Sequence, residues 1–250
     1  SVAVTGSLPV GVLEKIGERR YPHVALAAAT DPTVRIGDAR LPAPPVIVGA
    51  GPAGLFCALM LAENGYEPIL LERGGNVEER KAAVADFWEH RLLDPETNIQ
   101  FGAGGAGTFS DGKLVTRVND PLGAYVLRTF VRFGAPDEIL TQAKPHIGTD
   151  ILGEVVSAML HEVERLGGSV RYHTRLDDMV CRGDAVSEVV TNRGDIPAGA
   201  LVLATGHSAR DTYRMLLRKG LPLSAKAFSV GVRVEHLQED IDEAPYGDFA

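Results

Sequence analysis

The sequence has little cysteine and little tryptophan, and positive charge is in deficit. Its 250 residues include 2 cysteines and 1 tryptophan, and 25 lysines and arginines stand against 33 acidic residues, a net charge of −8. The cysteines, Cys57 and Cys181, have no CxxC spacing, which argues against a disulfide-stapled secreted domain and a dithiol redox site. Cys57 falls on the apolar face of a predicted helix, so we expect it to be a small core residue.

Long apolar runs are also missing. The longest, Leu55–Ala62, is too short to cross a bilayer, and the N-terminus lacks the basic start and apolar centre of a signal peptide. The acidic balance disfavours nucleic acid, whose phosphates require a basic surface. We therefore expect a cytoplasmic protein without a nucleic-acid or membrane partner. Because the chain starts at Ser1 rather than Met, we also expect a fragment of a longer product.

The most informative stretch that is present is an apolar strand followed by a glycine-rich turn. Val46–Val48 predict a buried strand, and the turn and the helix after it resemble the dinucleotide fingerprint GxGxxG. In that fingerprint the glycines allow a tight turn, backbone approach to a pyrophosphate, and close helix–strand packing, while the helix N-terminus faces the phosphates. The candidate cofactor-binding residues here are Gly49, Ala50, Gly51, Pro52, Ala53 and Gly54.

A second predicted strand, Pro68–Leu71, ends on an acid. The carboxylate of Glu72 is placed to accept the hydroxyls of an adenosine ribose, which supports an adenine dinucleotide rather than an ordinary βαβ turn. The same pattern suits NAD and FAD. The order of later elements favours FAD, because a long segment outside the parallel sheet, a helix and a three-stranded β-meander lie between Glu72 and the returning strand Leu201–Gly206. The three short strands Val170–His173, Asp178–Cys181 and Ala185–Thr191 are expected before it.

This order predicts an α/β fold, a Rossmann-like FAD-binding domain with a β-meander, followed by the start of a mixed α+β substrate domain. It resembles the glutathione-reductase-type FAD domain, in which an Ala-Thr-Gly strand end packs beside the dinucleotide. The resemblance implies that Thr205, Gly206 and the pair Glu72–Arg73 lie at the cofactor, and that the backbone of Leu176 contacts adenine.

A second glycine-rich segment, Gly102–Gly107, is framed by Phe101 and Phe109 and ends in a polar cluster. It is either a mobile surface loop or a lining of the pyrophosphate by backbone amides. Hydroxyls and a lysine after it could reach the ribityl chain or flavin ring, where a cation stabilises the reduced flavin. The alternative is that this lysine, Lys113, is an ordinary solvated side chain with no role at the flavin. The candidates are Gly104, Gly105, Gly107, Thr108, Ser110, Asp111 and Lys113.

Further elements follow from caps and periodicity. Asn76 with Glu79 predicts a capped helix to about His90, Asp120 predicts a cap for the next, and Thr149 is predicted to cap a third. Phe228–Val234 alternate as a half-buried strand. Near the N-terminus, Val2–Val4, Val10–Glu18 and His23–Ala28 predict a strand, a helix and a strand.

Three histidines could serve as acid–base groups: His146, His207 and His236. None has metal-ligand spacing, and we expect them to be structural hydrogen-bonding groups rather than catalysts, which leaves the catalytic residues unknown.

The segments Asn98–Leu114, Lys144–Thr149, Gly206–Thr212 and Phe228–His236, together with the fingerprint, resemble an uncharacterised family of bacterial FAD-dependent dehydrogenases. The resemblance implies three parts: residues 1–43 as the tail of an N-terminal α+β module and linker, 44–212 as the FAD-binding domain, and 213–250 as the beginning of a truncated substrate domain. It implies an FAD oxidoreductase with a small-molecule substrate and an unidentified electron donor or acceptor. Family members also carry a later Gly-Asp segment that closes the FAD site, so this piece alone is expected to hold the adenosine half better than the flavin ring and to be catalytically weak.

Two alternatives remain open at this point. The first is an NAD(P)-binding dehydrogenase or sensor, since the fingerprint and acid also suit NAD. The second is a flavin-binding protein without turnover.

Overall fold

The computed structural model describes residues 15, 40–109, 114, 120–142, 144–228, 230–232 and 234–246. The three elements predicted within residues 1–39 lie outside this part of the chain, apart from Lys15, which is helical. Two compact units are distinguished, Ser1–Met215 and Leu216–Ala250, and each is described by itself.

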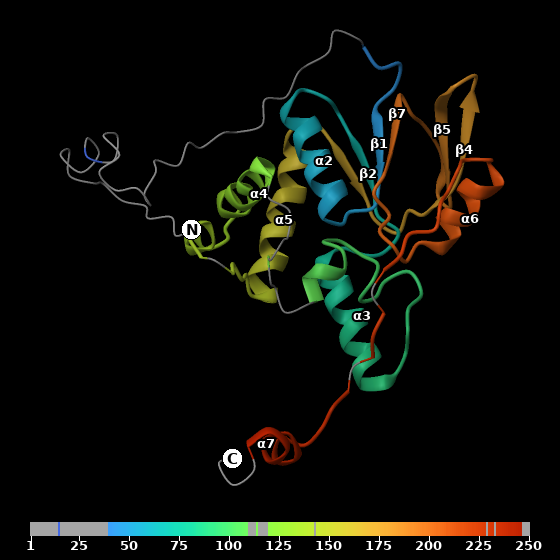
Figure 1. The fold of residues 1–250 in the computed structure, drawn as a ribbon. Helices are drawn as coiled ribbons and strands as arrows, with labels where there is room; N and C mark the ends of the chain where they lie inside the picture. Colours follow the sequence, from blue (N-terminus) through green and yellow to red (C-terminus); the bar gives the residue numbers. More distant parts are fainter. Residues whose placement is uncertain are drawn as a thin grey trace. The chain divides into compact units, whose positions relative to one another are not determined.

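The first unit is built on a four-stranded parallel sheet (Figure 1). Its strands are β1 (Pro45–Val48), β2 (Ile69–Leu71), β3 (Ser169–Arg171) and β7 (Ala200–Leu203), in the spatial order β3-β2-β1-β7. Every residue of β1 is buried, as expected for a central parallel strand whose two faces are both covered. The predicted apolar strands at 46–48 and 68–71 are confirmed, and the strand predicted at 201–206 is present but ends at Leu203.

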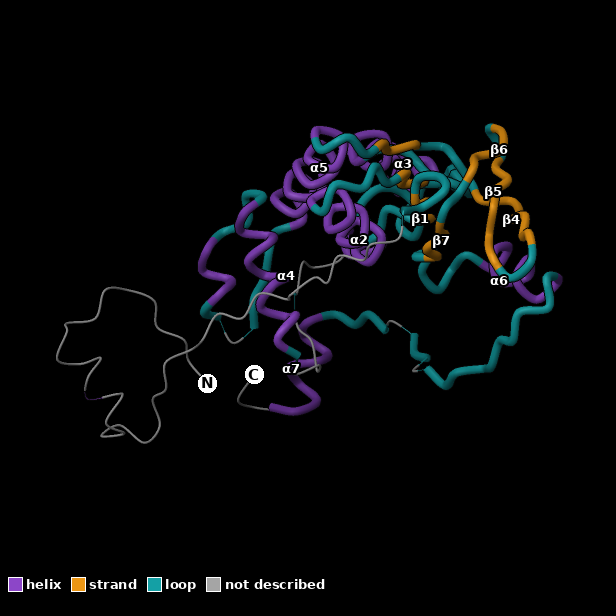
Figure 2. Tube along the Cα trace, turned by 90° about the horizontal axis from the view of Figure 1, so that it is seen from above, coloured by secondary structure: helices purple, strands orange, loops and turns teal. Residues whose placement is uncertain are grey.

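Helices α2 (Pro52–Glu63) and α5 (Thr149–Arg165) lie together on one face of this sheet, and the second sheet lies on the other side (Figure 2). Helix α4 (Pro121–Arg132) and the short 3₁₀ helix η2 (Asp137–Leu140) add to the helical layer, where the rings of Phe56 and Phe130 meet edge to face at 5.5 Å. Helix α3 (Val77–His90) follows β2 in the chain, and the 3₁₀ helix η1 (Ala106–Phe109) follows the second glycine-rich segment.

The second sheet is antiparallel and contains β4 (Leu176–Arg182), β5 (Ala185–Thr191) and β6 (Gly194–Pro197). A three-stranded meander is therefore present, but its membership differs from the prediction. The predicted strand Val170–His173 is β3 and pairs with β2 in the parallel sheet, whereas β6 was not predicted. Only Ile196 of β6 is buried, so the strand has no alternating pattern to read.

The helix caps follow the predictions with one exception. Asn76 and Glu79 form the full capping box, and the Asp120 side chain accepts the N–H of Leu122. The cap of α5 is Gly148 rather than Thr149, which is already helical. The predicted cap was wrong by one residue, because Thr149 already has helical conformation and the N-cap position falls on Gly148, which has no side chain to accept a first-turn amide.

Helix α6 (Arg210–Arg218) begins in the first unit and ends in the second, and α7 (Gln238–Tyr246) belongs to the second. The predicted strand Phe228–Val234 is wrong for its described residues. They form no strand, and Phe228 and Val232 are 83% and 88% exposed. Alternation shows which side chains a strand would bury, but a strand also needs a neighbour for its hydrogen bonds, and the described part of this unit supplies none. No described helix is both long and apolar enough to cross a membrane.

Candidate functional site

The glycine-rich turn after β1 connects the sheet to α2. The amide of Gly49 donates to the carbonyl of Leu71 at 2.7 Å, and Gly51 is the N-cap of α2. A Cβ atom on Gly54 would lie 1.9 Å from the Gly49 carbonyl oxygen, so helix and turn touch through backbone alone. Pro52 begins the helix with Ala53 behind it, and no side chain caps this N-terminus among the described residues. Its first-turn amides and dipole therefore face outward, as an anion site requires.

The carboxylate of Glu72 is buried at the end of β2, beside this turn. Its Oε2 accepts the amide of Ala50 at 2.9 Å, and its Oε1 accepts the amides of Gly74 at 2.9 Å and Gly102 at 3.0 Å. A carboxylate has about four acceptor positions, so three are used by the protein and one remains on Oε2. The acid predicted to hold a ribose thus also ties together three backbone segments.

The second glycine segment lies directly on the first. The amide of Gly104 donates to the Ala50 carbonyl at 2.9 Å. A Cβ atom on Gly105 would lie 3.0 Å from both the Cα of Gly51 and the Cδ of Pro52, so only a residue without a side chain fits here unstrained. The alternative of a mobile surface loop is therefore wrong for residues 102–104, which are buried. The amides of Gly104 and Gly105 donate to the carbonyls of Ala50 and Gly102, which does not favour the prediction that these two amides line a pyrophosphate.

Those residues are described only in part. Gly107 and Thr108 lie in η1, where Thr108 is buried and its hydroxyl donates to the Gly105 carbonyl at 3.1 Å. The candidates Ser110, Asp111 and Lys113 lie outside the described residues.

The end of β7 approaches the same turn. A Cβ atom on Gly49 would lie 2.5 Å from the Ala204 carbonyl oxygen and 3.3 Å from the Cα of Thr205, so the Ala-Thr-Gly segment is beside the first glycine. The Gly206 carbonyl accepts the hydroxyl of Tyr213 at 2.7 Å. Leu176 begins β4 and is buried, and the amide of Thr174, two residues before it, donates to the backbone carbonyl of Glu72 at 2.9 Å. The segment Ala204–Thr205 therefore lies beside the turn, and the chain just before Leu176 is bonded to the backbone of Glu72.

Arg73 follows Glu72 and is held by two acids. Its guanidinium bonds to Glu96 at 2.6 Å and to Asp211 at 2.7 Å, and it lies 4.3 Å from the centre of the Phe101 ring. Burial opposes the charge on both partners. The ion pair nonetheless outweighs burial, so the pKa of Arg73 rises and the pKa of Asp211 falls below its usual range. Arg73 therefore fastens α6 and the segment before the glycine loop to the end of β2.

The sequence reasoning missed Arg80, which is fully buried on α3. Its guanidinium donates to the carbonyls of Asn98, Ile99, Ala103 and Gly105 at 2.9, 2.8, 2.8 and 2.7 Å. Burial lowers its pKa to about 10, and it is therefore still a cation at neutral pH. A signal was available, because Val77 and Val84 place Arg80 on the apolar face of α3 by their helical spacing.

A pocket of about 460 Å³ adjoins this region and is largely apolar. A hydrogen bond of 3.2 Å between Ser208 and Gln100 crosses its lining, and Phe101, the residue stacked on Arg73, is part of its wall. No sequence motif indicated it, because its residues come from three separate segments. The lining is Val84, Phe87, Leu93, Pro95, Asn98, Ile99, Gln100, Phe101, Ser208 and Arg210.

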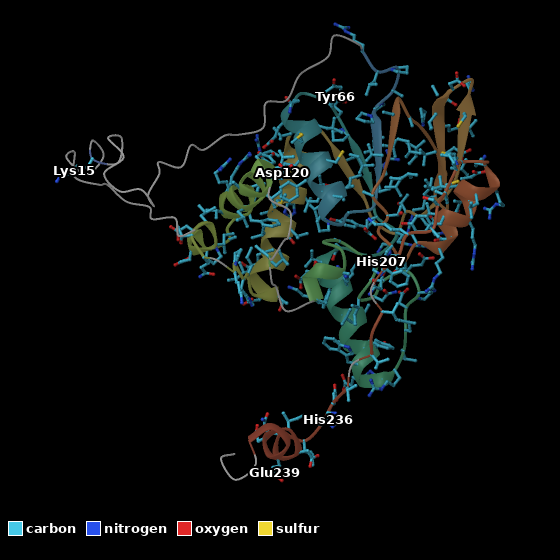
Figure 3. The ribbon with its side chains drawn as sticks, in the orientation of Figure 1. Lys15, Tyr66, Asp120, His207, His236 and Glu239 are labelled. Atoms are coloured by element: carbon cyan, nitrogen blue, oxygen red, sulfur yellow. The ribbon has the colours of Figure 1, made fainter. Side chains whose placement is uncertain are left out.

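His146, His207 and His236 are exposed, and Figure 3 shows His207 beyond the carboxyl end of the parallel strands, in the segment after β7. No cluster of metal-ligating side chains occurs within the described chain. Burial raises the pKa of the Cys57 thiol, as befits a packing residue, and Cys181 is exposed on β4.

Comparison with known proteins gives a family match over most of the chain. Residues 44–220 match the family model described as pyridine nucleotide-disulphide oxidoreductase. An uncharacterised protein of Clostridium beijerinckii is 46% identical over 215 residues, which are 86% of this chain and 40% of that protein. The chain therefore spans less than half of this relative's length.

Two solved structures are similar at lower identity. Thermovibrio ammonificans THI4 is 18% identical, with 72% of this chain and 64% of that chain covered and a TM-score of 0.47. Glycine oxidase from Bacillus cereus is also 18% identical, with 72% of this chain and 58% of that chain covered and a TM-score of 0.45.

Proposed function

Because the chain belongs to the pyridine nucleotide-disulphide oxidoreductase family, we propose that it is the FAD-binding part of an FAD-dependent oxidoreductase. The observation that carries the proposal is the meeting of two glycine segments and one buried acid at the open N-terminus of α2. Gly105 lies against Gly51, and Glu72 bonds to both segments. Such a place suits a ligand with a ribose on one side and two phosphates on the other.

The residues present fit FAD. The uncapped first turn of α2, at Ala53 and Gly54, would hold the pyrophosphate, and the remaining acceptor position of Glu72 would hold the adenosine ribose. Thr205 and Gly206 would line the dinucleotide beside Gly49, and the backbone of Leu176 would contact adenine. When bound, FAD supplies a group that accepts a hydride or two electrons. The chain's own residues bind and orient it.

The proposal extends to features beyond the family match. We assign the domain to the glutathione-reductase type within a bacterial FAD-dependent dehydrogenase, with residues 1–43 as the end of a preceding module, 44–212 as the FAD-binding domain and 213–250 as the start of a substrate domain. The partners are a small molecule and an electron donor or acceptor, in the cytoplasm. The two cysteines of these 250 residues, Cys57 and Cys181, lie on α2 and β4 without the CxxC spacing of a dithiol redox site. We therefore assign no electron-transfer role to them.

The test is a visible spectrum and a cofactor titration. The purified chain is titrated with FAD and, separately, with NADH, and any cofactor released by heat is identified. A two-band flavin spectrum and tighter binding of FAD than of NADH are expected. Tighter binding of NADH would favour the NAD-binding alternative, and a colourless full-length gene product that takes up no FAD would end the proposal.

Turnover is tested on the full-length product. Reduction of bound FAD by NADH or dithionite, followed by reoxidation with candidate acceptors, is the expected behaviour of an oxidoreductase. A bound flavin that dithionite reduces but no donor or acceptor pair turns over would identify a passive flavin-binding protein instead.

A further inference from the structure

Arg80 is the one fully buried cation in the described chain, and nothing in the nucleotide motif accounts for it. Its donors point in three directions along a single loop. Nε reaches Asn98, Nη2 reaches Ile99, and Nη1 reaches Ala103 and Gly105, with Gly102 at the longer distance of 3.4 Å. The guanidinium therefore binds carbonyls at both ends of the segment from 98 to 105.

The other side of the same segment is held by amide bonds. Glu72 accepts the Gly102 amide, the Gly75 carbonyl accepts the Ala103 amide at 3.1 Å, and the Ala50 carbonyl accepts the Gly104 amide. The loop thus gives its carbonyls to Arg80 and its amides to the ends of β1 and β2. A peptide fixed from both sides has little freedom to move away from α2.

The packing around Arg80 is equally close. A Cβ atom on Gly102 would lie 2.5 Å from its Cδ, and the Phe109 ring lies 4.7 Å from its Cζ. Several carbonyls and a ring face suit a planar guanidinium, whose five N–H donors form a rigid fork. A lysine ammonium is a point charge with three donors and could not reach the same acceptors together.

We propose that Arg80 is a positioning residue for the phosphate-binding part of the nucleotide site, which it shapes by pressing the loop 102–105 against Gly51 and Pro52. Arg80 touches no ligand and acts through the loop. The inference rests on the proposed function for its ligand, but the holding of the loop can be measured without one.

The experiment compares Arg80→Lys with the matched control Arg165→Lys. Arg165 lies on α5, its side chain is 66% exposed, and its ion pair is with Glu162. Affinities for FAD, ADP and adenosine are measured by calorimetry on the folded 250-residue chain. The ratio of ADP to adenosine affinity is the decisive quantity, because a general loss of folded protein lowers both affinities alike.

In Arg80→Lys we expect the ADP-to-adenosine ratio to fall by about tenfold, equivalent to about 1.4 kcal/mol, with FAD affinity falling in parallel. Arg165→Lys should leave both unchanged. An unchanged ratio in a folded Arg80→Lys protein that still binds ADP would overturn the inference. If neither the wild-type chain nor the full-length product binds ADP or FAD, the proposed function fails instead.

A second measurement covers the case in which Arg80→Lys does not fold. Amide hydrogen exchange of the wild-type chain without ligand should show slow exchange at Ala103 and Gly104, at a level near that of the core strands. Exchange at these amides as fast as at the exposed Gly183 turn would show that Arg80 does not hold the loop, and the inference would be withdrawn.

Discussion

Replacing Glu72 with glutamine tests whether this acid holds the protein together as well as a ligand. The carboxylate accepts three amides, two on Oε1 and one on Oε2. A glutamine keeps one oxygen, which would face the two amides of Gly74 and Gly102. Its NH₂ group would then face the Ala50 amide, so that a donor meets a donor and one bond is lost.

The expected cost follows from these three bonds. A hydrogen bond to a charged group contributes about 1.5–3 kcal/mol, and a neutral one about 1 kcal/mol. One charged bond disappears and two become neutral, while the neutral amide is easier to bury than a carboxylate. We therefore expect Glu72→Gln to lower the free energy of unfolding by about 2–4 kcal/mol, a large part of the 5–15 kcal/mol typical of a domain.

The assay is urea unfolding of the 250-residue chain at neutral pH without cofactor, which separates stability from ligand binding. Glu89→Gln is the matched control, because the Glu89 side chain is 76% exposed and its carboxylate lies 3.9 Å from Nε2 of His90, too far for a hydrogen bond. The control should change stability by less than about 0.5 kcal/mol. A Glu72→Gln protein within that same range would refute the account of Glu72 as the tie between three segments.

Two further predictions concern the contacts around the turn. Gly105→Ala and Gly65→Ala share a positive φ, +68° and +79°, but a Cβ atom meets backbone only at Gly105. Backbone strain should lower the free energy of unfolding of both variants by about 1 kcal/mol. Gly105→Ala should lower it by about 1 kcal/mol more, because the new Cβ meets the α2 turn, and should also weaken FAD binding. Equal losses of stability for the two variants in urea unfolding would argue against the close approach at Gly105. The ion pair of Asp211 with Arg73 lowers the pKa of Asp211 in the folded chain, so its stabilisation is present above the unfolded pKa and lost as pH falls through the lower folded value. Asp211→Asn should thus cost up to about 1 kcal/mol at pH 6 and progressively less below pH 4, measured by urea unfolding across that range, and a cost that grows on acidification would contradict the ion pair.

The sequence was sufficient for elements that carry a local pattern. The buried strand Val46–Val48, the capping box at Asn76 and the acid at Glu72 each have a signal within a few residues, and the structure contains all three features. Elements defined by distant partners were harder. The strand at 194–197 buries one side chain, and the strand predicted at 228–234 had alternation but no neighbour among the described residues.

The candidate site shows the same division. The two glycine segments could each be found in the sequence, but their contact could not, because about 50 residues separate Gly51 from Gly105 and only the fold brings their backbones together. Arg80 was missed for a related reason. A charged residue on an apolar helix face reads as a mismatch until the carbonyls that receive it are known.

Glu72 and Arg80 together change how the fingerprint works in this chain. In the fingerprint the acid binds the ribose of the ligand, whereas in this chain three acceptor positions of Glu72 bind protein amides. Arg80 binds carbonyls on the other side of the same loop. Under the proposed function, Glu72 and Arg80 would therefore shape the nucleotide site from two sides of this loop. Because ordering a loop on binding consumes part of the binding energy, a loop fixed in advance leaves more of that energy as affinity. Under the proposed function, these two buried residues would link the stability of the domain to its capacity to bind a dinucleotide, and one substitution should weaken both.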